Sequence, residues 1–416
     1  MGIVTRLIGR PARDRAYAQP SFVDLPAARM PSRPAATRAG APAAGAQPAL
    51  RDVFTPTRPQ RSSRRVIGRQ PEMLRIFRAL ALDRAHVVLY GERGRGKTSV
   101  VNMVAGAARS AGYMVGRYAC SAESEFDEIM RGLARDLPHS LLAVPVSEDN
   151  FDGCVAALPA ARLTPRDIAA LPSRLTGRHL VLIVDEFDRV EDDATRTRFA
   201  DTIKQVSDRG VALSFIIVGV SDSLEELLGR HPSIQRNILG LALPLLNDAQ
   251  VEEILVRGGE EVGVTFPAAA RRTIVDLARG VPYIAQLLGL HAGDESVSRG
   301  RTEVGPVEMR AACQRALDEM DPRLAVLYKR LVGRGRDGAM REVLHAIASG
   351  EQDRFARFTV QVAGGAVTAA GRRLDPAQWR LLVESGAVRE CPSAGAEMYT
   401  FADAMLPHYI LLRDAL

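Results

Sequence analysis

The sequence predicts an α/β fold built on a parallel β-sheet with helices on both faces. Short runs of apolar, often β-branched residues, among them 87–90, 113–118 and 213–218, are separated by segments of helical pattern. A strand that is apolar along its whole length is typical of a parallel sheet covered on both sides. A glycine-rich loop over 91–98 lies between the first of these strands and a helix expected over 99–109.

The loop reads Gly91-Glu92-Arg93-Gly94-Arg95-Gly96-Lys97-Thr98 and matches the phosphate-binding pattern G-x-x-x-x-G-K-[ST]. Its glycines allow backbone N–H groups to approach a polyphosphate closely at the start of a helix. We expect Lys97 to reach the β and γ phosphates of ATP, Thr98 to give a hydroxyl to Mg²⁺, and Ser99 to complete the binding loop. A glycine-rich turn without a ligand is the alternative interpretation.

A second apolar run, 179–184, ends in the adjacent acids Asp185 and Glu186. Carboxylates at the C-terminal end of a buried parallel strand lie at the crevice where ligands bind. We expect Asp185 to hold Mg²⁺, directly or through water, and Glu186 to orient and deprotonate the attacking water. The acids also fit an ordinary transition from strand to loop, but next to the phosphate loop they predict a P-loop NTPase.

Length and composition limit the remaining possibilities. With 416 residues, 46% of them hydrophobic, the chain is long enough for two or three domains. It has no run of about 18 apolar residues, so no transmembrane helix is expected. The four cysteines are scattered and form no C-x-x-C pair. This spacing argues against a zinc site or a disulfide framework and favours a reducing, cytoplasmic location.

The first 65 residues differ in composition from the rest of the chain. They contain twelve arginines, no lysine and three acids, so they carry more than the whole formal net charge of +6. Proline, alanine and glycine are frequent there, which predicts a disordered basic tail over 1–65. Such a tail could contact DNA or another acidic surface, or be only a solvated extension. The prolines disfavour the amphipathic helix of a transit peptide.

Beyond the tail, the pattern divides the chain into three predicted domains. A nucleotide-binding α/β domain is expected over 66–246. A helical lid is expected over 247–320, where proline and glycine mark helix starts and stops. A winged-helix-like α+β domain is expected over 321–416. Its evidence is a set of helices near 323–332, 340–348 and 376–384, followed by a hairpin that pairs 387–390 with 398–401.

From residue 66 to the C-terminus the chain resembles the AAA+ ATPases, and among them bacterial relatives of the origin-recognition initiators and of the signal-transduction (STAND-like) NTPases. Besides the two nucleotide motifs, Val66-Ile67-Gly68-Arg69 looks like the segment that packs on adenine, which implies a contact through Ile67. The strand over 215–220 looks like the sensor 1 strand, whose polar tip watches the γ-phosphate. The resemblance implies this role for Ser221 or Asp222.

Two further segments carry the resemblance. The stretch 231–236 is similar to the one that bears the arginine finger, which implies that Arg236, or else Arg230, enters the ATP site of a neighbouring subunit in a homo-oligomer. A surface arginine is the alternative. Gly280-Val281-Pro282 lacks the sensor 2 arginine of many initiators and looks like the G-x-P form of the signal-transduction NTPases, where Pro282 approaches the base. This departure counts against fast hydrolysis.

Two functions follow as hypotheses. The first is an ATP-driven assembly switch that acts on DNA through the basic tail or the winged-helix-like domain. The second is a STAND-like regulatory NTPase that binds a protein partner. Between 374 and 390 only Arg380 and Arg389 are cationic, against three acids, so the helix over 376–384 is a weak candidate for reading a DNA groove. A small-molecule kinase has the least support, because no acceptor-site motif is visible.

Overall fold

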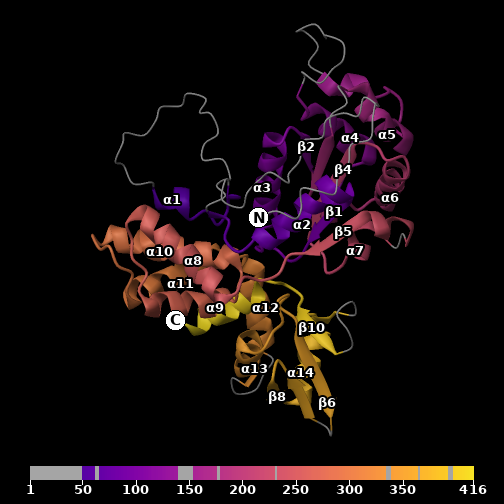
Figure 1. Cartoon of the computed structure of the whole chain (residues 1–416). Helices are drawn as coiled ribbons and strands as arrows, with labels where there is room; N and C mark the ends of the chain where they lie inside the picture. Colours follow the sequence, from indigo (N-terminus) through magenta and orange to yellow (C-terminus); the bar gives the residue numbers. More distant parts are fainter. Residues whose placement is uncertain are drawn as a thin grey trace, which may run out of the picture.

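The computed structural model describes residues 49–60, 65–138, 153–175, 179–229, 232–333, 339–363, 366–391 and 397–416 (Figure 1). The predicted tail before residue 49 and the second finger candidate, Arg230, lie outside these residues. No helix in the described part of the chain combines the length and the apolar character needed to span a bilayer.

A parallel sheet organises the first half of the molecule. Within the described residues it has five strands, in the order β2-β3-β4-β1-β5. The strands are β1 (His86–Tyr90), β2 (Met114–Ala119), β3 (Leu180–Asp185), β4 (Leu213–Gly219) and β5 (Ile238–Ala242). Each lies within one residue or so of a predicted apolar run. The predicted sheet is therefore confirmed, and β1, which lies between β4 and β5, leads directly into the glycine-rich loop.

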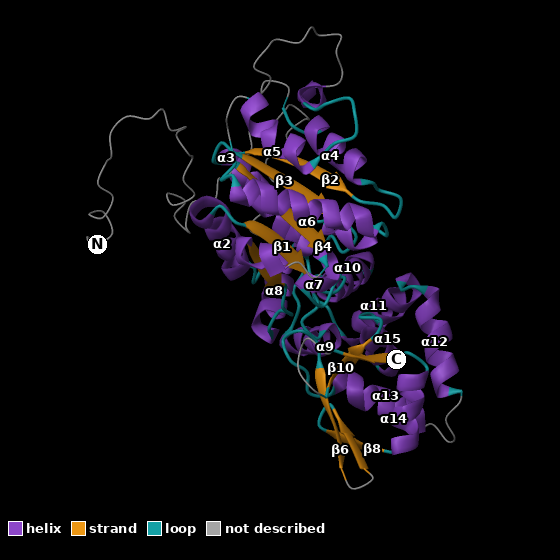
Figure 2. Ribbon diagram, turned by 90° about the vertical axis from the view of Figure 1, so that its right-hand side faces the viewer, coloured by secondary structure: helices purple, strands orange, loops and turns teal. Residues whose placement is uncertain are grey.

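Helices cover both faces of this sheet (Figure 2). One face carries α2 (Gln70–Arg78) and α3 (Lys97–Ser110), and the other carries α4 (Phe126–Arg135), α5 (Pro165–Arg174) and α6 (Asp193–Asp208). Successive side chains of β1 point to opposite faces of the sheet. Val87 and Leu89 pack in the core with α3, whereas Val88 packs in the core with α6. Because both faces are covered, no position in the strand has to be polar.

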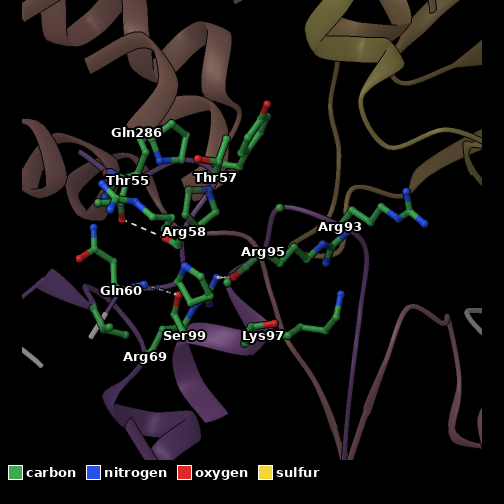
Figure 3. Close-up of a pocket in the computed structure, with 18 of the residues that line it drawn as sticks. Thr55, Thr57, Arg58, Gln60, Arg69, Arg93, Arg95, Lys97, Ser99 and Gln286 are labelled. Carbon is green, nitrogen blue, oxygen red and sulfur yellow. Dashed lines mark hydrogen bonds between the residues drawn. The ribbon is translucent and has the colours of Figure 1, made fainter. Parts of the chain in front are cut away.

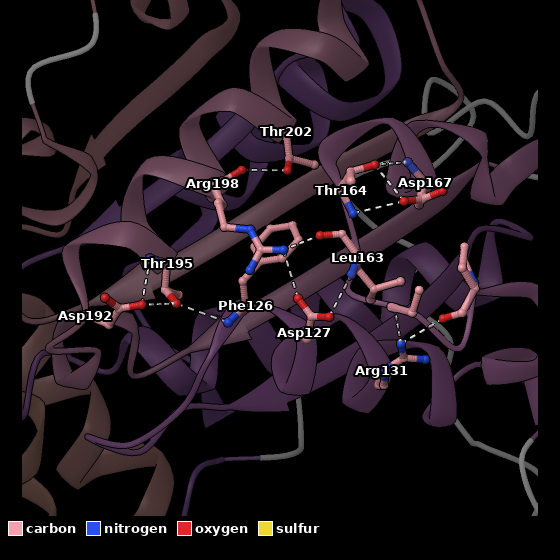
Figure 4. A network of polar contacts seen from close by, with 12 residues as sticks. Phe126, Asp127, Arg131, Leu163, Thr164, Asp167, Asp192, Thr195, Arg198 and Thr202 are labelled. Carbon is pink, nitrogen blue, oxygen red and sulfur yellow. Dashed lines mark hydrogen bonds and ion pairs between the residues drawn. The ribbon is translucent and has the colours of Figure 1, made fainter.

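A polar network fixes the start of α4 against α6 (Figure 4). The guanidinium of Arg198 lies 4.4 Å from the centre of the Phe126 ring and donates to Asp127 Oδ1 at 2.9 Å. The backbone N–H of Phe126 donates to Thr195 Oγ1 at 3.1 Å. These contacts satisfy a free donor at the helix terminus. The helix therefore begins at Phe126.

The second half of the molecule contains a helical region, which is the predicted lid and is called the lid below, and a C-terminal region. The lid helices are α8 (Asp248–Val262), α9 (Ala268–Ala278), α10 (Pro282–Ser298) and α11 (Pro306–Glu319). The C-terminal helices are α12 (Pro322–Val332), α13 (Ala339–Ser349), α14 (Pro376–Glu384) and α15 (Leu406–Asp414). The C-terminal strands are β6 (Phe358–Ala363), β7 (Ala366–Ala369), β8 (Arg372–Leu374), β9 (Val388–Glu390) and β10 (Met398–Phe401).

The C-terminal strands form an antiparallel sheet in the order β8-β7-β6-β10-β9 within the described residues. The predicted pairing of β9 with β10 is confirmed, while β6, β7 and β8 were not predicted. A signal for β6 was present, because Phe358 and Val360 are buried and alternate with the exposed Thr359 and Gln361. That two-residue period is typical of a strand with one face on a core.

The lid and the C-terminal region share one hydrophobic core. Ile274 of α9 and Leu288 of α10 belong to the same buried cluster as Leu412 of α15. The ring of His408, also on α15, donates from Nδ1 to the carbonyl of Leu277 at 2.9 Å. The predicted boundary at residue 320 therefore does not separate two cores. The lid and the C-terminal region form a single packed body beside the sheet.

Buried histidines predict a loss of stability in acid. Burial lowers the pKa of His86 to about 3, and Nδ1 of this ring accepts the backbone N–H of Phe215 at 3.0 Å. Protonation of Nδ1 would abolish that bond. The unfolded chain, with a histidine pKa of about 6.5, binds more protons, so the free energy of unfolding should fall as the pH drops from about 6.5 towards 3.

The measurement is urea unfolding at pH 7 and pH 5 for the wild type and for His86→Asn. Keeping His86 neutral at pH 5 costs about 2 kcal/mol relative to pH 7. The variant should therefore lose about that much less stability between the two pH values. An identical pH dependence in both proteins would contradict the assignment.

Candidate nucleotide-binding site

A cavity of about 630 Å³ opens where the sheet meets the lid (Figure 3). This volume lies in the range of about 300–1,000 Å³ that small-molecule sites occupy. The cavity lies at the C-terminal ends of β1, β3 and β4, where ligands of parallel sheets bind. Its walls come from the glycine-rich loop, the acids after β3, the end of β4, the lid helix α10 and an N-terminal segment over 55–60.

The glycine-rich loop presents its backbone to this cavity. Gly94 and Gly96 have φ angles of 78° and 86°, in the left-handed region that glycine adopts without strain. A Cβ atom added to Gly96 would meet nothing within 4 Å, so the space over the start of α3 is open. The first N–H groups of a helix have no partner inside it and favour an anion. Gly91 and Glu92 belong to the loop but do not line this cavity.

Lys97 is a half-buried cation that lines the cavity. Its Nζ donates to the carbonyls of Gly91 at 2.7 Å and Glu92 at 3.0 Å. Burial lowers the pKa of Lys97 to about 8, with the charge of Asp188 acting in the opposite direction. The ammonium is thus hydrogen-bonded to neutral acceptors in a place where its charge is costly. An anion that enters the cavity would stabilise the charged form.

Asp185 lies at the end of β3, buried and facing the same cavity as Thr98. Its Oδ2 accepts from Arg117 Nη2 at 2.5 Å, and Arg117 Nη1 donates to Asn102 Oδ1 at 2.5 Å. Arg117 lies on β2, next to β3, and no motif singled it out. A carboxylate and a hydroxyl are the hard oxygen ligands that Mg²⁺ prefers, so the site fits this ion. A bound metal would compete with Arg117 for Asp185.

Two more acids line the cavity after β3. Glu186 has a φ of 56°, and its Oε2 accepts from Arg189 Nη1 at 3.0 Å in a pair that is half exposed. Asp188 accepts the backbone N–H of Val220 at 2.8 Å, which joins the ends of β3 and β4. Glu186 is therefore available at the cavity edge once it leaves Arg189. Asp188, which the sequence analysis left without a role, is a second carboxylate at this position.

The structure directs Ser221 away from the cavity. Its Oγ lies 2.6 Å from Glu226 Oε2 and 2.7 Å from the carbonyl of Ser223, at the start of α7 (Leu224–Leu228). Ser221 thus organises the helix start and does not line the cavity. The alternative sensor candidate, Asp222, is bonded to Arg389 of the C-terminal region.

The remaining predicted residues divide into two groups. Ile67 and Pro282 line the cavity, and so do Arg93, Arg95 and Ser99 of the loop. Arg236 lies elsewhere, exposed on the short 3₁₀ helix Pro232–Asn237 after α7. It does not line the cavity of its own chain, and its role in a neighbouring subunit stays a prediction.

Residues 49–60, which the sequence analysis included in the disordered tail, form an ordered arm on the lid (Figure 1). The arm contains α1 (Leu50–Val53), followed by the buried Phe54. A Cβ atom added to Gly258 of α8 or Gly289 of α10 would lie 2.5 or 2.7 Å from the Phe54 ring. The two glycines therefore form a slot for this ring. The spacing of Leu50, Val53 and Phe54 is that of one helix face, and it was the missed signal.

The arm then runs across the cavity. The backbone N–H of Thr55 donates to Gln286 Oε1 of α10 at 3.0 Å, and that of Gln60 donates to Ser99 Oγ of α3 at 3.2 Å. Figure 3 shows Thr55 and Gln60 on the same side of the cavity as Gln286. The arm thus links the lid to the helix that follows the phosphate loop. A ligand in the cavity lies against this arm.

Comparison with known proteins agrees with this geometry. Residues 81–228, which contain the loop, the acidic strand end and β4, match the model of a family described as AAA domain. Because of this similarity, we call the segment the AAA domain. The match runs from the helical turn before β1 to α7, so it includes β1, β2, β3 and β4 but not β5. No curated protein matches the chain.

Several solved structures superpose on the AAA domain and the regions after it. The Walker-type ATPase PABY2304 of Pyrococcus abyssi superposes with a TM-score of 0.54 at 17% identity, over 87% of this chain and 99% of that one. The ORC1 protein of Aeropyrum pernix in complex with DNA gives 0.45 at 16%, over 88% and 96%. Cdc6p of Pyrobaculum aerophilum gives 0.47 at 15%, over 89% and 100%. The first likeness confirms the P-loop NTPase fold class, and at this identity it extends to the fold alone.

The slot for Phe54 gives a test of the arm. Gly258→Ala places a methyl group against the ring and should release the arm, because neither the helix backbone nor the ring can move aside without cost. We expect faster tryptic cleavage after Arg51, an exposed residue on α1 of the arm, in the folded protein. Gly106→Ala on α3 is the control, since an added Cβ there meets nothing within 4 Å. Equal cleavage of the two variants would contradict the assignment.

Proposed function

We propose that the chain is an AAA+ ATPase that binds ATP with Mg²⁺ and hydrolyses it, slowly, as a switch for assembly. The observation that carries this proposal is the pairing of Lys97 with an open glycine cradle on one side of the cavity and Asp185 on the other. A half-buried cation, free helix N–H groups and an acidic metal ligand are what a triphosphate with its metal requires.

The residues of the cavity have distinct roles in this proposal. The backbone of 91–99 would wrap the phosphates and Lys97 would contact the β and γ groups. Thr98 and Asp185 would hold Mg²⁺, which neutralises charge on the phosphates when bound. Glu186, after release from Arg189, would orient the attacking water and accept its proton. Ile67 and Pro282 would contact the base, together with the arm over 55–60.

Assembly enters through Arg236. It is exposed and outside its own cavity, as a residue that completes the site of a neighbouring copy must be. We propose a homo-oligomer in which ATP lies between subunits, with DNA as the platform. The arginine-rich tail and the winged-helix-like C-terminal region are the surfaces that would contact DNA.

A second function, a STAND-like switch that binds a protein partner, gains support from Arg389. Of the two cations near α14, Arg389 is bonded to the AAA domain and only Arg380 remains on the exposed side of the helix. A helix that reads a DNA groove needs more cationic or amide groups than this. The Gly280-Val281-Pro282 turn, which places Pro282 on the cavity, fits this alternative equally well.

Calorimetry and phosphate-release assays test the ATPase. Wild-type protein should bind ATP with Mg²⁺, and Lys97→Ala should weaken binding by roughly ten- to a hundredfold, the usual cost of a lost charged hydrogen bond. Arg236→Ala should bind ATP normally and lose turnover in the assembled complex. No heat of binding for folded wild-type protein would refute ATP binding. Full turnover in Arg236→Ala would refute only the contribution between subunits.

Retention on double-stranded DNA separates the two functions. If DNA is the platform, binding should fall steeply between about 50 and 200 mM salt, because each neutralised phosphate releases counterions. A chain that starts at residue 49 should show a shallower salt dependence, since it lacks the tail arginines. Absence of binding by the full chain at low salt would leave the protein-partner function.

A further inference from the structure

A single arginine of the C-terminal region contacts the nucleotide side of the AAA domain at two places. Arg389, on β9, donates from Nη2 to Glu92 Oε1 at 3.0 Å and from Nη1 to Asp222 Oδ2. Glu92 belongs to the phosphate loop, and Asp222 follows β4 at the predicted sensor tip. We call these three residues the Arg389 bridge. They are separated by more than a hundred residues in sequence and meet only in the fold.

The bridge lies in a region where an unpaired carboxylate would be costly. The side chains of Glu92 and Asp222 are only 16% and 18% exposed, and that of Arg389 is 39% exposed. Burial, followed by the charge of Asp222, raises the pKa of Glu92, and the charge of Arg389 opposes both. Two acids thus repel each other beside the phosphate loop, and the arginine between them compensates their charge.

Other contacts join the C-terminal region to the same loop. Arg95 donates to the carbonyl of Phe355 at 2.7 Å, and the backbone N–H of Leu245 donates to the carbonyl of Arg354 at 2.7 Å. The methyl end of Met405 would lie 3.4 Å from a Cβ added to Gly94. The C-terminal region therefore contacts the phosphate loop at Glu92, Gly94 and Arg95.

We propose that Arg389 is a positioning residue of the nucleotide site. When the C-terminal region is docked on the phosphate loop, Arg389 neutralises Glu92 and Asp222, and the loop binds a polyphosphate more tightly than when this region is displaced. This inference rests on the proposed function. When the C-terminal region is displaced, the bridge breaks and two carboxylates remain next to the loop that binds the phosphates. Their repulsion lowers the affinity for an anion. By linkage, a bound polyphosphate favours the docked state to the same extent.

Displacement also opens the cavity itself. The lid and the C-terminal region share a core, so a movement that breaks the bridge carries the lid with it. The lid supplies Pro282, Tyr283 and Gln286 to the cavity wall. A displacement that breaks the Arg389 bridge therefore also removes these three residues from the cavity wall. Through both effects, the position of the C-terminal region would change the affinity for nucleotide.

The test is calorimetric titration of the full chain with ATP and Mg²⁺. Arg389→Gln should weaken binding by about tenfold, within the range of 5–150-fold usual for coupling between sites. Arg373→Gln, an exposed arginine on β8 of the same sheet, is the matched control and should bind as the wild type does. Arg389→Lys keeps the charge and should recover part of the affinity.

A double variant of the two acids is the decisive part of the experiment. Glu92→Gln with Asp222→Asn should bind ATP more tightly than the wild type, because two negative charges near the phosphates are removed. Adding Arg389→Gln to this pair should then have no further effect. An equal loss of affinity from Arg389→Gln in both backgrounds would overturn the proposal, because Arg389 would then act without the acids.

The remaining outcomes are also distinguishable. Wild-type affinity in Arg389→Gln would overturn the inference and leave the proposed function intact. If Arg389→Gln does not fold, the double variant Glu92→Gln, Asp222→Asn still tests the inference. Weaker ATP binding by this double variant than by the wild type would overturn the inference. A folded wild-type chain that binds no ATP would refute the proposed function itself.

Discussion

The nucleotide-binding cavity depends on the partial burial of one ammonium group. Lys97 is held at the start of α3 by neutral carbonyls, and burial lowers its pKa to about 8. A buried charge is tolerated only when the surrounding structure holds it in place, here through the sheet below the loop and the glycines within it. Among the described residues, the ammonium group of Lys97 is therefore hydrogen-bonded to neutral groups only, and an anion in the cavity would compensate its charge.

Much of this arrangement could be predicted from sequence, because it is local or periodic. The strands are apolar runs with both faces covered, and the two nucleotide motifs follow directly after β1 and β3, where a parallel sheet places its ligand. The missed arm and β6 also had local signals, in the spacing of Leu50, Val53 and Phe54 and in the alternation from Phe358 to Gln361.

The partners of the motif residues could not be predicted in this way. Arg117 reaches Asp185 because β2 pairs with β3, and Arg389 reaches Glu92 because the C-terminal sheet packs on the loop. Neither contact follows from the spacing of residues along the chain, and many other arginines have similar neighbours in the sequence. The orientation of Ser221 could not be predicted for the same reason, because its hydroxyl is hydrogen-bonded to Glu226 of the next helix.

The Phe54 slot has a mechanical consequence. The chain that precedes residue 49, with most of the tail arginines, continues directly from a segment whose ring is inserted between two lid helices and whose backbone borders the cavity. A force applied to that preceding chain would reach the arm at α1, where the Phe54 ring anchors it between α8 and α10.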